Sequence, residues 1–118
     1  MSLRSFKNAF SGIAAALKDG SNIRFMSVCF ILIIPISFIL GLSGLEWAVV
    51  LLCCAGVISL EMVNTAIEAA VDAKTSGFHP CAKKAKDAAA GAVLLFCIFS
   101  AAIGLIIFVP HIVELFGR

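Results

Sequence analysis

Long apolar runs alternate with short polar segments along this chain and divide it into distinct elements. Residues 25–42 form an uncharged run, a second apolar run begins near Glu46 and continues to about residue 73, and a third occupies about 87–113. As helices, all three are long enough to cross a hydrocarbon layer of about 30 Å. We therefore predict three transmembrane helices over about 25–42, 46–73 and 87–113.

The N-terminal segment has a different pattern. Over residues 2–18, apolar side chains recur on one helical face, at Phe6, Phe10, Ile13 and Leu17. The polar side chains of the segment lie mostly off that face, which is typical of an amphipathic helix lying in the headgroup region. The pattern predicts a surface helix over about 2–18, ahead of the three spans.

The composition supports an integral membrane protein. Hydrophobic residues make up 62% of the 118 residues and charged residues 14%, whereas about half is the norm for soluble domains. We expect one domain over 1–118. The net charge of +2 is too small to suggest a nucleic-acid partner. The five cysteines form no CxxC pair and no Cys/His spacing, so we interpret them as packing residues.

The basic residues predict the orientation in the membrane. Four precede the first span and four lie between the second and third spans, whereas only Arg118 lies beyond the third. Because cytoplasmic loops carry the excess of Lys and Arg, we expect the N-terminus and the polar loop over residues 74–86 to lie in the cytoplasm. The C-terminus is then expected on the outer side.

A stripe of polar residues occupies the end of the second span. At about 100° per residue, its members fall at roughly 0°, 300°, 340° and 20° around the helix axis: Glu61, Asn64, Glu68 and Asp72. This helix would be about 42 Å long, so its C-terminal turns protrude from the hydrocarbon. Carboxylates near a membrane are costly unless they face a cavity, partner or ion. We therefore interpret the stripe as an active-site face at the cytoplasmic surface.

Antiparallel packing of the second and third helices would set Lys86 and Asp87 beside Glu68 and Asp72. Carboxylates with a lysine suit Mg²⁺ and phosphoryl transfer, although no Walker A or kinase motif is present. Asp72 and Asp87 also fit plain helix-end positions. The alternative function is a non-enzymatic subunit that moves ions along the stripe, but the clustering of acids at one face favours an enzyme.

Residues 61–72 (EMVNTAIEAAVD) and 79–93 (HPCAKKAKDAAAGAV) resemble the prokaryotic diacylglycerol kinase family, which includes undecaprenol kinases. The likeness extends to residues 5–13 in the N-terminal helix. It implies a homotrimeric lipid kinase of the bacterial inner membrane, which uses ATP and Mg²⁺ at sites between subunits. Residues 86–93 look closer to the Gram-positive form, which favours undecaprenol over diacylglycerol as substrate.

The resemblance also implies roles for single residues. By position, Glu61 matches the catalytic carboxylate and Glu68 a carboxylate that holds the metal on ATP. Together with Asp72 of the stripe, the expected nucleotide-binding residues are Asn8, Asn64, Glu68, Gly77, His79, Lys86 and Asp87. Asn8 falls where family members often have a tyrosine, and His79 also fits an ordinary loop residue.

One position departs from the family pattern. Family members typically have a metal-binding Glu two residues before the position of Asn22, and this chain has Gly20 there. Either Asp19 supplies the oxygen through a small shift in register, or metal affinity is weakened. A catalytically degenerate family member is the alternative that this departure leaves open.

Overall fold

The computed structural model describes residues 1–117, and in this range it contains helices and no strand. The four helices are α1 (Leu3–Asp19), α2 (Ser21–Leu40), α3 (Gly44–Lys74) and α4 (Pro80–Phe116). Three of them are long and apolar enough to cross a membrane, over Asn22–Leu40, Gly44–Lys74 and Pro80–Phe116. The predicted all-helical fold with three spans is confirmed. The basic residue expected on the outer side, Arg118, lies outside the described residues.

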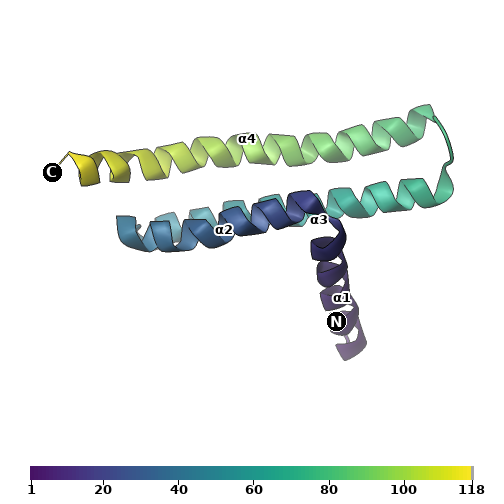
Figure 1. The fold of residues 1–118 in the computed structure, drawn as a ribbon, viewed down its shortest axis with the longest axis horizontal. Coiled ribbons are helices and arrows are strands. Elements are labelled where there is room, and N and C mark those ends of the chain that lie inside the picture. The colour runs from purple at the N-terminus through teal and green to yellow at the C-terminus, as the bar shows by residue number, and fades with distance from the viewer. Residues whose placement is uncertain (118) are drawn as a thin grey trace.

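Helix α1 projects away from the direction that the other three helices share (Figure 1). Ser2 caps its first turn, because the Ser2 hydroxyl accepts a hydrogen bond from the Ser5 N–H at 3.2 Å. The four apolar residues of the predicted face are all exposed, and α1 has no buried residue. No other part of residues 1–117 therefore covers this face.

Only Gly20 separates α1 from α2, so the first span begins earlier than residue 25. The Gly20 N–H donates to the Ala16 carbonyl at 2.8 Å, and the Gly20 backbone is extended. This conformation ends α1 and redirects the chain. A Cβ atom at this position would lie 2.8 Å from the Ala16 oxygen. The close approach explains why a glycine stands at this junction.

The turn between α2 and α3 combines two termination signals. Gly41 adopts the left-handed conformation (φ 72°), and its N–H donates to the Ser37 carbonyl at 3.1 Å. Ser43 then begins α3 through a capping box with Glu46, in which each side chain accepts from the other residue's N–H. The chain therefore reverses direction within residues 41–43.

Helices α3 and α4 run antiparallel side by side along most of their length, and residues 75–79 connect them (Figure 1). The expected polar loop over 74–86 is wrong in its second half, because residues 80–86 are the first turns of α4. Pro80 suits the first position of a helix, and the His79 Nδ1 atom accepts from the Cys81 N–H at 3.2 Å. The lysines of this segment consequently stand on a regular helix.

Little of the chain is buried. A small core of Leu42, Val50 and Ile107 lies at the end of the helices where α2 turns into α3. At the same end, the Glu46 carboxylate accepts a hydrogen bond from the His111 Nε2 atom at 3.0 Å and so joins α3 to α4. Most large apolar side chains are exposed, as expected where lipid replaces water.

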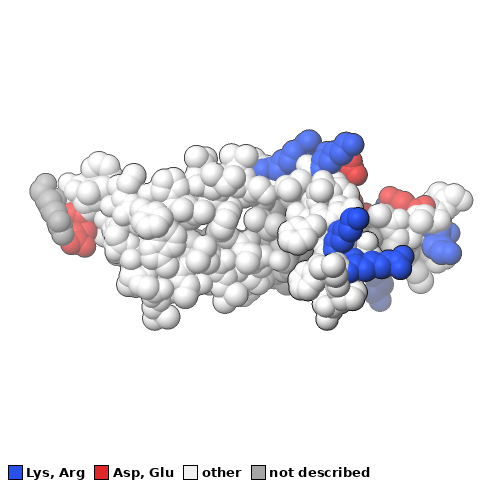
Figure 2. All heavy atoms as spheres, turned by 90° about the horizontal axis from the view of Figure 1, so that it is seen from below, with Lys and Arg blue, Asp and Glu red and all other residues white. Residues whose placement is uncertain are grey.

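Most of the charged side chains on the face seen in Figure 2 gather toward one end of the molecule, an acidic side chain lies at the opposite end, and the middle of that face carries none. This end includes α1 and the connection between α3 and α4. The distribution matches the spacing of charged residues in the sequence and places the polar chemistry of the molecule at this end.

Candidate active site

The polar stripe of α3 passes from a buried to an exposed environment. Glu61 and Asn64 are each only 7% exposed, whereas Glu68 and Asp72, further along the helix, are exposed. The Asn64 amide nitrogen donates to the Glu68 Oε1 atom at 3.0 Å, one helical turn away. A hydrogen bond therefore joins two of the four stripe residues, Asn64 and Glu68, which lie between the buried Glu61 and the exposed Asp72.

The Asn64 side chain is only half satisfied. Its Oδ1 atom is buried and has no hydrogen-bond partner among residues 1–117, and a buried acceptor without a partner is costly. An amide oxygen beside two carboxylates is a set of hard donors of the kind Mg²⁺ takes. The orphaned oxygen is therefore available to a ligand or to an ion.

The described residues contain no group of three or more His, Cys, Asp or Glu side chains that could hold a metal ion. Glu68 and Asn64 offer a carboxylate and an amide oxygen on adjacent turns. Mg²⁺ is commonly bound by one or two carboxylates together with substrate phosphates and water. The donor set thus fits a cation that arrives with phosphate better than one held by the protein alone.

A second cluster forms where α3 ends and α4 begins. The Lys86 ammonium lies 2.6 Å from the Asp72 Oδ1 atom, so an ion pair joins the two helices. A cavity of about 210 Å³ lies at this place. Five of the predicted nucleotide-binding residues line it: Asp72, Gly77, His79, Lys86 and Asp87.

The expected contact of Lys86 with Asp72 is therefore present, whereas Asp87 makes its ion pair with Lys83 one turn earlier in α4. Lys83 lines the same cavity. Sequence reasoning treated Lys83 as a topology signal and missed it as a site residue. The spacing of four residues between Lys83 and Asp87 is the sequence feature that indicates this contact, because such residues are neighbours on one face of a helix.

Two predicted residues stand apart from these clusters. Asn8 is exposed on α1, and no hydrogen bond among residues 1–117 joins it to the stripe. Asp19 is the exposed last residue of α1, and it completes no metal-binding group with the carboxylates of α3 within the described chain. Within the described residues of the single chain, Asn8 and Asp19 therefore belong to neither the polar stripe nor a metal-binding group.

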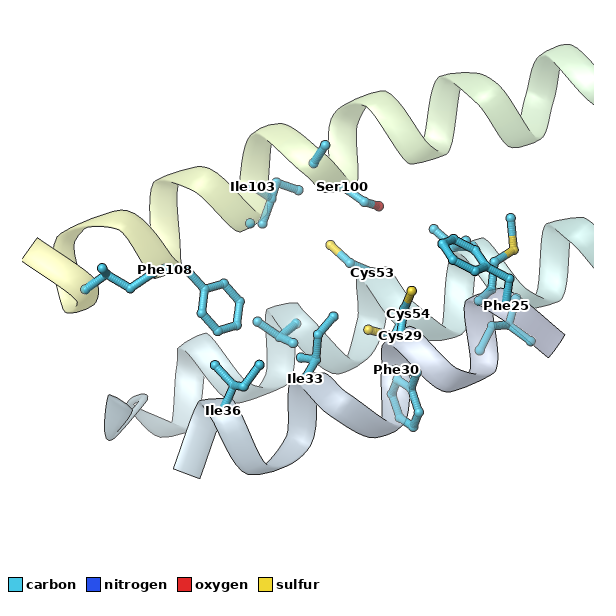
Figure 3. Close-up of a pocket in the computed structure, with 17 residues that line it drawn as sticks. Phe25, Cys29, Phe30, Ile33, Ile36, Cys53, Cys54, Ser100, Ile103 and Phe108 are labelled. Carbon is cyan, nitrogen blue, oxygen red and sulfur yellow. The ribbon is translucent and has the colours of Figure 1, made fainter. Parts of the chain in front are cut away.

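A larger apolar cavity of about 450 Å³ lies among α2, α3 and α4 (Figure 3). Phe25, Cys29, Ile33, Cys53, Ser100 and Phe108 are among the side chains that line it. Its lining is almost entirely hydrocarbon and thiol, apart from the buried Ser100 hydroxyl, which has no partner among the described residues. Such a cavity suits an apolar ligand that enters from the membrane.

Helix α3 connects the two cavities. Residues from Val50 to Ile58 line the apolar cavity, and Asp72 lines the polar one. Glu61 follows Ile58 by three residues, and at about 1.5 Å per residue Asp72 lies about 16 Å beyond Glu61. The buried Glu61 carboxylate lines neither cavity and lies along α3 between the residues that line the apolar cavity and Asp72, which lines the polar one.

These features define a small multi-pass membrane protein with a polar site at one end of its helices. The family model for prokaryotic diacylglycerol kinase matches residues 7–108. The chain is 42% identical over 109 residues to an undecaprenol kinase of Bacillus subtilis, which covers 92% of this chain and 89% of that protein. It is 35% identical over 114 residues to a diacylglycerol kinase of Synechocystis, covering 96% of this chain and 65% of the relative.

A diacylglycerol kinase of Helicobacter pylori is 37% identical over 99 residues, or 81% of this chain and 77% of that protein. The chain belongs to the prokaryotic diacylglycerol kinase family. It is a lipid kinase of a bacterial membrane. The family resemblance read from residues 61–72 and 79–93 is confirmed.

Proposed function

We propose that this protein transfers the γ-phosphate of ATP, with Mg²⁺, to the primary hydroxyl of a membrane lipid alcohol, and that the alcohol is undecaprenol. One observation carries the proposal: the buried Glu61 lies on α3 between an apolar cavity and a polar cavity that contains Lys86. A phosphotransfer between a lipid and a nucleotide needs this arrangement, because its two substrates arrive from different phases.

Glu61 is the proposed general base. Its place one turn beyond Ile58, which lines the apolar cavity, would let a hydroxyl arrive from the membrane side, and the polar stripe leads away from it toward the charged end. In phosphoryl transfer, a carboxylate orients the attacking hydroxyl and accepts its proton. Asn64, one turn away, holds Glu68 by a hydrogen bond and keeps a free oxygen for the ligand.

The polar cavity is the proposed nucleotide site. Lys86 supplies positive charge for phosphate oxygens, and the 75–79 connection provides a backbone loop in which Gly77 has φ 73°. His79 and Asp87 line the same space, and Asn8 of α1 is assigned to the nucleotide by the family resemblance. The separation between Glu61 and Asp72 along α3 is one that an extended nucleoside triphosphate can bridge.

Glu68 and Asp19 are the proposed metal ligands. Bound Mg²⁺ would neutralise charge on the phosphate oxygens during transfer. The backbone at Gly20 explains why the ligand would move to Asp19: a side chain on Gly20 would press its Cβ to within 2.8 Å of the Ala16 oxygen. A carboxylate one residue earlier avoids that contact.

We further propose a homotrimer with the N-terminus and the active site in the cytoplasm. The incomplete metal site of the single chain supports an assembly in which a neighbouring copy adds ligands. The exposed apolar face of α1 supports its placement on the membrane surface, since nothing among residues 1–117 covers it. Eight basic residues on the side of α1 and the 75–79 connection support the orientation.

The choice of undecaprenol rests on the similarity to the kinase of Bacillus subtilis that carries this name. The apolar cavity supports a long hydrocarbon tail without selecting one, because the Ser100 hydroxyl is the one hydroxyl group that the described residues contribute to its lining. Diacylglycerol is therefore the competitor that a direct assay must exclude.

The test is phosphate transfer by purified protein in lipid discs, with γ-labelled ATP and either undecaprenol or diacylglycerol as acceptor. We expect label in undecaprenyl phosphate at a higher kcat/KM than in phosphatidic acid, and loss of both products when Mg²⁺ is chelated. Faster labelling of diacylglycerol would overturn the proposed substrate. The absence of a labelled product from any lipid alcohol would identify a degenerate member of the family.

A further inference from the structure

The polar cavity contains two lysines, and each is already paired with a carboxylate. Lys83 pairs with Asp87 within α4, and the Lys86 ammonium lies 2.6 Å from the Asp72 Oδ1 atom across the junction of α3 and α4. All four side chains line the same cavity of about 210 Å³. The two ammonium groups that could bind phosphate are therefore already paired with carboxylates when no nucleotide is bound.

The pair between Lys86 and Asp72 is the one that links two helices. It joins the last turns of α3 to the first turns of α4, and residues 75–79 between them form the rest of the cavity wall. The Asp72 carboxylate is therefore the acidic partner of Lys86 across the junction of the two helices. The same carboxylate occupies a donor of the ammonium, which has three in total.

We propose that Asp72 lowers nucleotide affinity, because the phosphate oxygens must compete with its carboxylate for the Lys86 ammonium. This inference rests on the proposed function, in which the cavity binds ATP. Carboxylate and phosphate oxygens accept the same charge-assisted hydrogen bonds. One anion thus replaces the other at Lys86.

The exposure of the pair sets the size of the effect. The Lys86 and Asp72 side chains are 39% and 65% exposed, and ion pairs in such surroundings are weak. A weak pair is suited to a contact that must be exchanged in every catalytic cycle. Removing the Asp72 charge should therefore tighten nucleotide binding by about two- to five-fold, rather than by orders of magnitude.

The experiment is a double-mutant cycle in lipid discs with four proteins: wild type, Asp72→Asn, Lys86→Gln and the double variant. Dissociation constants are measured by calorimetry for the magnesium complex of β,γ-methylene ATP, without a lipid alcohol. Steady-state kinetics with ATP and undecaprenol are measured in parallel. Circular dichroism checks that each variant keeps its helices, and Asp72→Ser replaces Asp72→Asn if the latter does not fold.

We expect Asp72→Asn to lower both Kd and the KM for ATP by about two- to five-fold. In the Lys86→Gln background the same substitution should leave Kd and KM unchanged, because the ammonium for which the carboxylate and the phosphate compete is absent. Asp72→Glu should restore values near those of the wild type, because it returns a carboxylate to the same helix turn.

Weaker or unchanged binding in Asp72→Asn would overturn the inference, since it would mean that Asp72 contacts the nucleotide or has no part in binding it. An equal gain in both backgrounds would also overturn it, because general repulsion of phosphate does not need Lys86. A wild type that neither binds the analogue nor transfers phosphate would instead refute the proposed function. The two failures are therefore distinguishable.

Discussion

Glu61 is a carboxylate that this fold buries on α3, one turn beyond Ile58, the last residue of that helix that lines the apolar cavity. A buried carboxylate is destabilising unless it serves a purpose that offsets its loss of solvation. Its neighbour Asn64 is buried to the same degree and leaves its oxygen unpaired within residues 1–117. Two unfavourable placements one turn apart indicate that this part of α3 is built for ligand chemistry rather than for stability.

The substitution Glu61→Gln preserves shape and removes the base. We expect kcat for lipid phosphorylation to fall by about 10²- to 10⁴-fold, the usual scale for loss of a general base, while the helical content and nucleotide Kd stay close to those of the wild type. The matched control is Glu46→Gln at the opposite end of α3, which should keep its kcat. A Glu61→Gln protein with more than half of the wild-type turnover would refute the assignment.

The substitution Asp19→Asn tests the shifted metal ligand. If Asp19 binds the cation, losing its charge should raise the Mg²⁺ concentration needed for half-maximal activity, because a hard anionic ligand is lost. Glu68→Ala should act in the same direction, and its effect is expected to be larger because Glu68 also holds Asn64. An Asp19→Asn protein with the Mg²⁺ dependence of the wild type would remove Asp19 from the site.

Part of this site could be predicted from the sequence and part could not. Helical periodicity places Glu61, Asn64, Glu68 and Asp72 on one face, and antiparallel packing brings Lys86 to Asp72, as the structure shows. The burial of Glu61 and the orphaned oxygen of Asn64 depend on what packs over them, which spacing does not encode. The pairing of Asp87 with Lys83 was missed because residues 80–86 were expected to form a loop.

At the scale of elements, the apolar runs defined the spans well and their polar ends less well. Hydropathy ends where charges begin, so the sequence expectation began the third helix at 87, although backbone hydrogen bonding continues back to Pro80. A helix can carry lysines as readily as leucines once it leaves the hydrocarbon. The boundary of a span and the boundary of its helix are therefore different quantities in α4.

Close contact between α3 and α4 depends on Gly56. A Cβ atom there would lie 2.2 Å from the Phe96 ring, so Gly56→Ala should overpack the interface and destabilise the fold by about 1–3 kcal/mol. Thermal unfolding in detergent measures this loss. Gly104→Ala on α4 is the control, since nothing lies within 4 Å of its added carbon, and Phe96→Leu should restore part of the stability of Gly56→Ala. Equal melting temperatures for Gly56→Ala and Gly104→Ala would contradict the close packing.

At the scale of the whole molecule, the separation of charged and apolar surface indicates how the protein sits in its membrane. Basic side chains occupy the end that carries α1 and the 75–79 connection (Figure 2), and the opposite end is held by the small core and the pair of Glu46 with His111. If the polar cavity binds ATP as proposed, the end that carries it must face the compartment that supplies ATP. The distribution of basic residues and the proposed ATP site therefore both place this end of the molecule in the cytoplasm.

Cys81 offers a native probe of that orientation, because it is exposed in the first turn of α4. We expect a membrane-impermeant maleimide to label it in inverted membrane vesicles and not in right-side-out vesicles, since the positive-inside rule places this end in the cytoplasm. Cys81→Ser is the control and should abolish the label. The variant Leu45→Cys, at an exposed position of the opposite end, should show the reverse accessibility when combined with Cys81→Ser. Labelling of Cys81 from the outer side would place the nucleotide cavity away from ATP and refute the proposed orientation.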